Sequence, residues 1–339
     1  MRKIYQGERW KRYSRRRARK ELKKRRRGKL RAAALARKKH GVPRSPARRR
    51  IQRVDVAAPK VFSLIRNPEE STAFFARLAQ VFQTKRDAYV VLADVEELTS
   101  DAVVVLLSKL IDDRFLNGMT FGGNEPKAEG PKKLLHQAGF FEFVRSNQLK
   151  EPPEDGRIRR KTSTIVESAE AARLIQFATM RTIGRAEDRR SAYLALVECM
   201  ANTHEHSEQQ DEGVNPWWAN VYCPSKSRSS YFTVVDNGVG IFRSVTVRRV
   251  RRVMQKLVGD SGNADLLRDW LEGRIELPSR TGLRNRGKGL RAIHDRFKQG
   301  KLANLIVISN DVYANLRDNN YQTLAVPFKG TMIYWELSE

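Results

Sequence analysis

The chain has 339 residues, 40% of them hydrophobic, which is enough to bury the cores of two ordinary domains and excludes a chain that is disordered throughout. Its formal net charge is +28, but residues 1–50 hold 24 Lys or Arg against two acidic residues, so the remainder carries only +6. No apolar run approaches the roughly 18 residues of a membrane span, and no apolar signal core follows the N-terminal charges.

Residues 1–54 form a basic arm, with blocks such as Lys23–Arg27 and Arg48–Arg50. The stretch Leu30–Lys39 is rich in Ala, Leu, Arg and Lys, so a helix could form there on contact with a polyanion. Because such an arm neutralises phosphates and releases counterions, we expect nonspecific, salt-dependent nucleic-acid binding through residues 1–50. A membrane surface, the ribosome and an organelle import system are alternative partners for the same charges.

Residues 55–150 follow the pattern of a small α/β domain. An amphipathic stretch, Ser71–Gln83, precedes a strand-like run, Ala88–Val95, and a helix is expected over Ser100–Leu110. Pro131–Val144 is expected to be a helix that leads into a last apolar element. Leu92-Ala-Asp94-Val, followed by Leu98-Thr-Ser-Asp-Ala102, resembles the strand, acidic turn and helix start of the STAS domain of anti-anti-sigma factors and sulfate transporters.

Residues 151–165 are polar and rich in helix breakers, which predicts a linker. The domain expected at 166–339 begins with two helices, Ser168–Thr182 and Arg185–Glu205. Six strand-like runs follow, and we expect an α/β (α+β) sandwich in which a mixed sheet carries helices on one face. The runs are Trp217–Tyr222, Tyr231–Val235, Leu305–Ser309, Val312–Leu316, Tyr321–Val326 and Thr331–Leu337.

Glu198 and Asn202 are four residues apart in the second of these helices, so their side chains share one face. A carboxylate can accept a proton from water, and an amide oxygen suits a hard cation such as Mg²⁺. The alternative is an amphipathic helix whose polar side faces solvent.

Two glycine-containing motifs follow. Asp236 ends the apolar run Tyr231–Val235, and Gly238 and Gly240 let the backbone turn sharply, although Asp-Asn-Gly is also an ordinary turn sequence. Further on, Arg286-Gly287-Lys288-Gly289-Leu290 precedes a predicted helix. The amides at the start of that helix suit phosphate oxygens, to which Lys288 could add a positive charge.

These three motifs, in this order, resemble the ATP-binding domain of the GHKL family, which includes DNA gyrase, Hsp90, histidine kinases and MutL. The resemblance covers residues 166–339 and implies a Bergerat-type fold. It implies that Glu198 polarises the attacking water, Asn202 binds Mg²⁺ with the phosphates, and Asp236 accepts a hydrogen bond from adenine. The nucleotide-binding residues implied are Asn202, Asp236, Gly238, Gly240, Gly287, Lys288, Gly289, Leu290 and Thr331, the last as a hydroxyl near Asp236. Asn285 stands where many members have a further glycine.

The function that this resemblance implies is a Mg²⁺-dependent ATP-binding and hydrolysing switch. ATP would order a basic lid between Ile241 and Arg286 and so control contact with a protein partner. One alternative is a serine/threonine kinase of the anti-sigma-factor type, acting on a STAS-like domain at Thr99 or Ser100. The other is a nucleic-acid-binding protein with a degenerate ATPase fold.

Two cysteines, Cys199 and Cys223, are too few for a disulfide framework, and Cys199 has apolar neighbours in the predicted helix. The sequence therefore predicts a reducing, cytoplasmic setting. A homodimer is compatible with everything above.

Overall fold

Two main sheets organise the computed structural model, which describes residues 53–112, 119–144, 156–161, 168–187, 189–207, 217–224, 227–244, 262–275 and 289–338. Apart from its last two residues, which begin strand β1, the basic arm lies outside this part of the chain. Among the described helices, none combines the length and hydrophobicity that crossing a bilayer requires.

The N-terminal elements form a small parallel sheet in the order β1-β3-β5, beside a short parallel pair, β2-β4. Helices α2 and α3 make the crossovers that parallel strands require. The bounds are β1 Arg53–Ala57, β2 Val61–Phe62, α2 Pro68–Gln83, β3 Asp87–Val91, β4 Glu97–Leu98, α3 Ser100–Ile111, β5 Phe121–Gly123, α5 Glu129–Gln137 and α6 Phe140–Val144.

A five-stranded sheet with the order β6-β7-β8-β10-β9 follows. Its bounds are β6 Gly156–Lys161, β7 Trp217–Tyr222, β8 Ser229–Asp236, β9 Ala303–Asn315 and β10 Asn320–Ser338. All of its described pairings are antiparallel, so the expected mixed sheet is wrong for these strands. The last four strand-like runs join in pairs into two long strands, because a bulged hairpin tolerates their polar interruptions. Strand β6 lies within the segment expected to be a linker.

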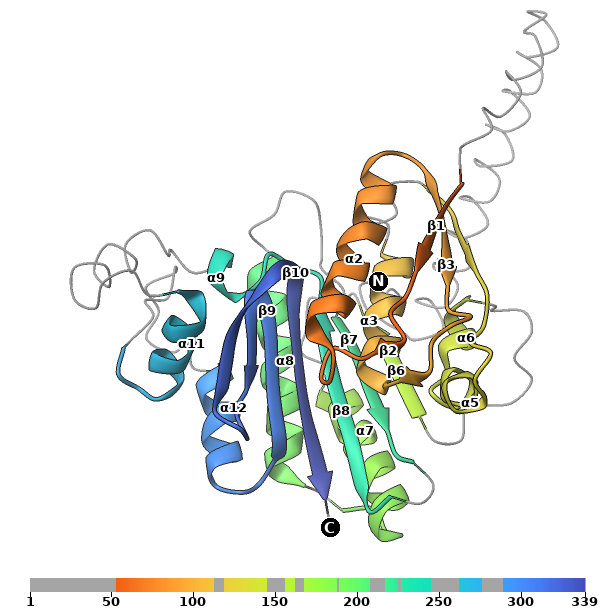
Figure 1. The fold of residues 1–339 in the computed structure, drawn as a ribbon. Coiled ribbons are helices and arrows are strands. Elements are labelled where there is room, and N and C mark those ends of the chain that lie inside the picture. Colours follow the sequence, from red (N-terminus) through yellow and green to blue (C-terminus); the bar gives the residue numbers. More distant parts are fainter. Residues whose placement is uncertain are drawn as a thin grey trace, which may run out of the picture. The chain divides into compact units, whose positions relative to one another are not determined.

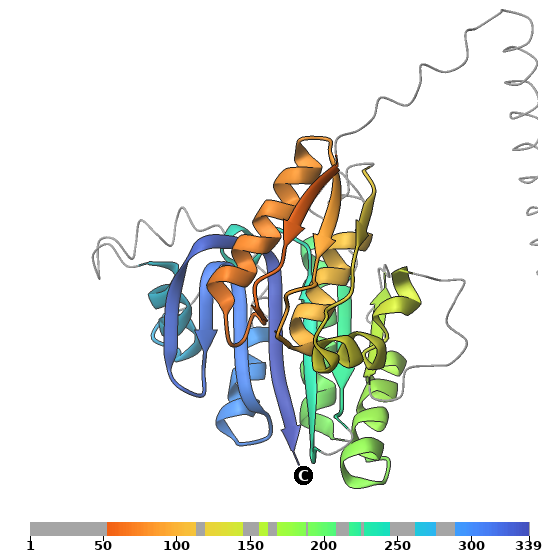
Figure 2. The same ribbon diagram turned by 45° about the vertical axis from the view of Figure 1, so that its right-hand side comes forward.

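Helices cover both faces of this sheet (Figures 1 and 2). Strand alternation sends Ala219 and Val234 into one core and Trp218 and Val235 into the other. The first core is closed by helices from the same half of the chain, whereas the second is closed by α2 and α3. The helices of the first face are α7 Ser168–Ile183, α8 Arg190–Ser207, α11 Asn263–Leu271 and α12 Gly289–Lys298.

Helix α3 is buried along its length, from Ser100 to Leu110. It packs on β7 and β8, while its other side contributes to the core beneath the parallel sheet. A helix with apolar residues on all of its faces is stable when protein surrounds it and its few polar side chains find partners. Residues 52–339 accordingly group as one compact unit, and the segments predicted as two domains share a core through this helix.

Candidate functional site

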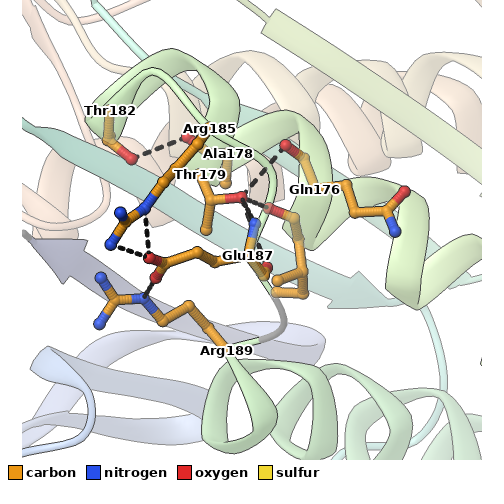
Figure 3. Close-up of polar contacts among 8 residues, drawn as sticks. Gln176, Ala178, Thr179, Thr182, Arg185, Glu187 and Arg189 are labelled. Atoms are coloured by element: carbon orange, nitrogen blue, oxygen red, sulfur yellow. Dashed lines mark hydrogen bonds and ion pairs between the residues drawn. The ribbon is translucent and has the colours of Figure 1, made fainter.

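Helix α8 carries the first motif, and the turn before it is fixed by Glu187 (Figure 3). The backbone N–H of Glu187 donates to Thr179 Oγ1 at 2.9 Å. The Glu187 carboxylate lies 2.6 Å from Arg185 Nη2 and 3.0 Å from Arg189 Nε. Because ion pairs at the surface contribute little, the bond to buried Thr179 is the stronger tie between this turn and α7.

The first and third motifs meet where α12 begins. A Cβ added to Gly289 would lie 2.9 Å from Glu198 Oε2 and 3.0 Å from Asn202 Oδ1. The glycine therefore lets the N-terminus of α12 lie directly against both side chains. Leu290 is buried in the core that α8 and α12 share. Gly287 and Lys288 lie outside the described residues.

Asp236 lies on the same face of the sheet as α8. Phe232 and Val234, two and four residues earlier in β8, point into the core beneath α8, so strand alternation directs Asp236 there too. Its cross-strand partner in β10 is Thr331, which is paired in turn with Ser309 of β9. Directly opposed side chains in antiparallel strands are neighbours. Thr331 is thus placed beside Asp236.

The thiol of Cys199 links the first motif to the second. Its pKa is raised mainly by burial, and then by the negative charges of Glu198 and Asp236. Both carboxylates therefore act on one buried group between α8 and the sheet. Because it is buried and its pKa is raised, Cys199 stays a neutral thiol and is unsuited to act as a nucleophile.

The second motif is a tight turn that requires glycine at position 240. Gly238 N–H donates to Asp236 Oδ1 at 2.8 Å, as in an Asx turn. Gly240 has φ +83°, and a Cβ there would lie 2.4 Å from the side chain of Asn310. The turn is therefore closed against Asn310, and neither its φ nor the available space admits a larger residue.

Sequence reasoning missed the two residues that hold this turn. Ser309 Oγ accepts from Ile241 N–H at 2.8 Å, and it lies 3.2 Å from Thr331 Oγ1. Asn310 donates to the Val239 carbonyl at 2.9 Å and accepts from a backbone N–H two residues after Gly240 at 3.1 Å. Asn310 has φ +54°, a conformation that Asn adopts more readily than most residues. In the sequence, Ser309 and Asn310 form a polar pair between two apolar runs, and this interruption could have predicted an irregularity in the strand.

Part of the predicted lid, Ile241–Arg286, is packed structure. Helix α9, Ile241–Ser244, contacts β9, and α11 buries Leu267 and Trp270 in the core. The basic side chains at 243–256, on which the partner-contact prediction depends, lie outside the described side chains. The segment that could close over a ligand is therefore shorter than the sequence suggested.

The donors at this site fit a nucleotide and Mg²⁺ in their chemistry. A carboxylate, an amide oxygen and the N-terminus of a ten-residue helix lie on one side of the sheet. Within the described ranges, no group of three or more His, Cys, Asp or Glu side chains could hold a metal alone. Mg²⁺ does not need such a group when phosphates and water complete its coordination.

The candidate phosphorylation site of the kinase alternative lies elsewhere. Ser100 is 5% exposed, and its carbonyl accepts from Asn220 Nδ2 at 3.3 Å on the sheet face opposite α8. Thr99 is the N-cap of α3, but its side chain makes no capping hydrogen bond. Helix capping therefore does not explain why a hydroxyl residue stands at this position. Transfer to Ser100 from a nucleotide beside α8 would require α3 to leave the sheet.

Comparison with known proteins adds no assignment, since neither a family model nor a curated protein matches the sequence at a significant level.

Proposed function

We propose that this protein is a Mg²⁺-dependent ATP-binding and hydrolysing switch, whose residues 166–339 form a nucleotide-binding domain of the GHKL type. The observation that carries the proposal is the contact of Gly289 with both Glu198 and Asn202, which joins motifs about 90 residues apart in sequence. The position of Asp236 on the same face adds the second motif.

In this proposal each polar group has a separate task. Asp236 accepts a hydrogen bond from the adenine amino group, with Thr331 beside it. Asn202 holds Mg²⁺, and the N-terminus of α12 faces the phosphates, where its unpaired amides and dipole favour negative charge. Glu198 orients and deprotonates the attacking water. Bound Mg²⁺ would supply charge neutralisation at the phosphate oxygens.

The switch in this proposal is the part of the predicted lid, Ile241–Arg286, outside the packed helices α9 and α11. Bound phosphates would order it and so change the surface that a protein partner contacts. Nonspecific nucleic-acid binding by the basic arm is an accessory activity in this proposal. It rests on the composition of residues 1–50.

Calorimetric titration of ATP·Mg²⁺ into wild type and Asp236→Asn tests the proposal, because the substitution removes the carboxylate with little change in volume. We expect saturable binding to wild type and a loss of about 100-fold in the variant, the discrimination that a lost charged hydrogen bond gives. Glu198→Gln is the matched control from the same face. It should keep nucleotide binding and lose turnover in a phosphate-release assay. Absence of binding to wild type would show that the three motifs are a degenerate scaffold.

A further inference from the structure

The side chain of Lys109 is buried where α3 packs between the two halves of the chain. It lies near the C-terminal end of α3, and the residue is 3% exposed. Burying an ammonium group is costly unless it is well paired. The hydrogen-bond partners of Lys109 therefore show which part of the structure this buried charge holds in place.

Lys109 Nζ donates to Asn237 Oδ1 at 2.7 Å and to the Lys329 carbonyl at 2.7 Å. It also lies 4.6 Å from the centroid of the Phe328 ring, within range of a cation–π interaction. One buried ammonium of the N-terminal half therefore contacts two chain segments of the C-terminal half.

These two segments flank the candidate adenine site. Asn237 follows Asp236, and strand alternation turns its side chain to the α3 face while Asp236 points to the α8 face. Lys329 precedes Gly330 and Thr331, the cross-strand partner of Asp236. Lys109 thus ties the end of β8 to the middle of β10, directly behind the Asp236–Thr331 pair.

The rest of the cluster fixes Asn237 from the same helix. Asn237 Nδ2 donates to the Ser108 carbonyl at 3.0 Å and lies 3.3 Å from Asp112 Oδ2. Asn237 and Asp112 are each 3% exposed. Every side-chain polar atom of Asn237 is therefore engaged by α3.

We infer that Lys109 is a positioning residue for nucleotide recognition, acting through Asn237 and the Lys329 carbonyl to set the orientation of Asp236. The inference rests on the proposed function. It makes α3, and with it the N-terminal α/β layer, part of the nucleotide site. By linkage, nucleotide binding stabilises the packing of α3 to the same extent that α3 favours binding.

The test compares wild type, Lys109→Met and Asn220→Val in titrations with ATP and with ITP, which lacks the adenine amino group. Met keeps the length of the side chain but removes its charge and donors. Asn220 is the matched control because it also makes a buried bond between the sheet and α3, to Ser100, away from Asp236. Both variants should lower the unfolding midpoint.

Lys109→Met should lower ATP affinity about tenfold, within the usual range of coupling between sites, and leave ITP affinity nearly unchanged, so the ATP/ITP affinity ratio should decrease about tenfold. Asn220→Val should keep the wild-type ratio. A purely structural role would lower both affinities together and leave their ratio intact, and that result would overturn the inference. If wild type binds neither nucleotide, the proposed function falls and this inference with it, whereas binding with an unchanged ratio in Lys109→Met removes the inference alone.

Should Lys109→Met fail to fold, Asn237→Ala removes one of the two contacts and is expected to shift the ratio in the same direction. Hydrogen exchange of wild type needs no variant. ATP·Mg²⁺ should slow exchange of the α3 amides, although α3 lies on the sheet face away from the ligand. Unchanged α3 exchange at saturating ATP would contradict the coupling.

Discussion

Gly330 shows how closely the backbone fits at the candidate adenine site. It has φ +103°, and a Cβ there would lie 2.0 Å from the Asp236 carbonyl oxygen. No side chain can occupy that space without moving β10 away from β8. The Asp236–Thr331 pair therefore depends on a glycine that the motif analysis did not select.

We predict that Gly330→Ala lowers the free energy of unfolding by about 2–3 kcal/mol, the cost of a strained backbone, and weakens ATP binding as well. Gly300→Ala is the control, because Gly300 has φ +67° but nothing within 4 Å of its added Cβ. It should cost about 1 kcal/mol and leave binding intact. Urea denaturation measures the free energy of unfolding of both variants. Equal decreases for Gly330→Ala and Gly300→Ala would show that the close approach to the Asp236 carbonyl does not cause the destabilisation.

At the scale of elements, α12 is held against α11 by a buried histidine. His294 Nδ1–H donates to the Leu271 carbonyl at 3.0 Å, and the side chain is buried. Burial lowers the pKa of His294, and the positive charge of Lys298 lowers it further. The N-terminus of this helix is the proposed phosphate site, so acid that loosens α12 also affects the site.

The sign of the pH effect follows from that pKa. In the unfolded chain the imidazole takes up a proton near its ordinary pKa of 6.5, whereas the folded state resists protonation until lower pH. The stability that neutral His294 supports is therefore present above 6.5 and decreases as the pH falls below it. Denaturant unfolding at neutral and mildly acidic pH should show a smaller decrease for His294→Gln, which keeps a donor but does not titrate. Parallel pH profiles for the two proteins would contradict this.

At the scale of the whole molecule, charge and fold are separate in sequence. Residues 1–50 carry +22 of the net +28, and residues 52–339 group as a compact unit of their own. Surface charge governs association with polyanions, whereas burial governs stability. Changes to the basic arm should therefore leave the stability of the folded region intact.

We predict that deleting residues 1–50 leaves the thermal unfolding midpoint unchanged and removes the salt-dependent binding of single-stranded RNA or DNA. Fluorescence anisotropy with labelled oligonucleotides across a salt series measures the slope. Replacing the five basic residues Lys23–Arg27 with glutamines should reduce the magnitude of that slope by about 3.5, since each phosphate contact on a single strand contributes about 0.7. A steep slope that survives the deletion would move nucleic-acid binding to the folded region.

The sequence by itself determined the local structure of this protein. The runs that predict α7, α3 and β7 coincide closely with the observed elements, because periodicity and propensity act over neighbouring residues. Helix α8 was expected to begin at Arg185 but begins at Arg190. Neighbouring residues were also sufficient to predict that Glu198 and Asn202 share one helix face and that Asp236 lies at a strand end. The convergence of these motifs was expected only from a resemblance.

Tertiary structure alone decided strand order, pairing direction and the sharing of one core by both halves of the chain. Apolar α3 predicts burial, but nothing in its own sequence says that two sheets surround it or that Lys109 reaches Asn237, 128 residues away. Ser309, Asn310 and Gly330 gain their importance in the same way, from contacts across strands. The physical reason is that such contacts depend on the free energy of the whole packed core, which no local stretch of residues encodes.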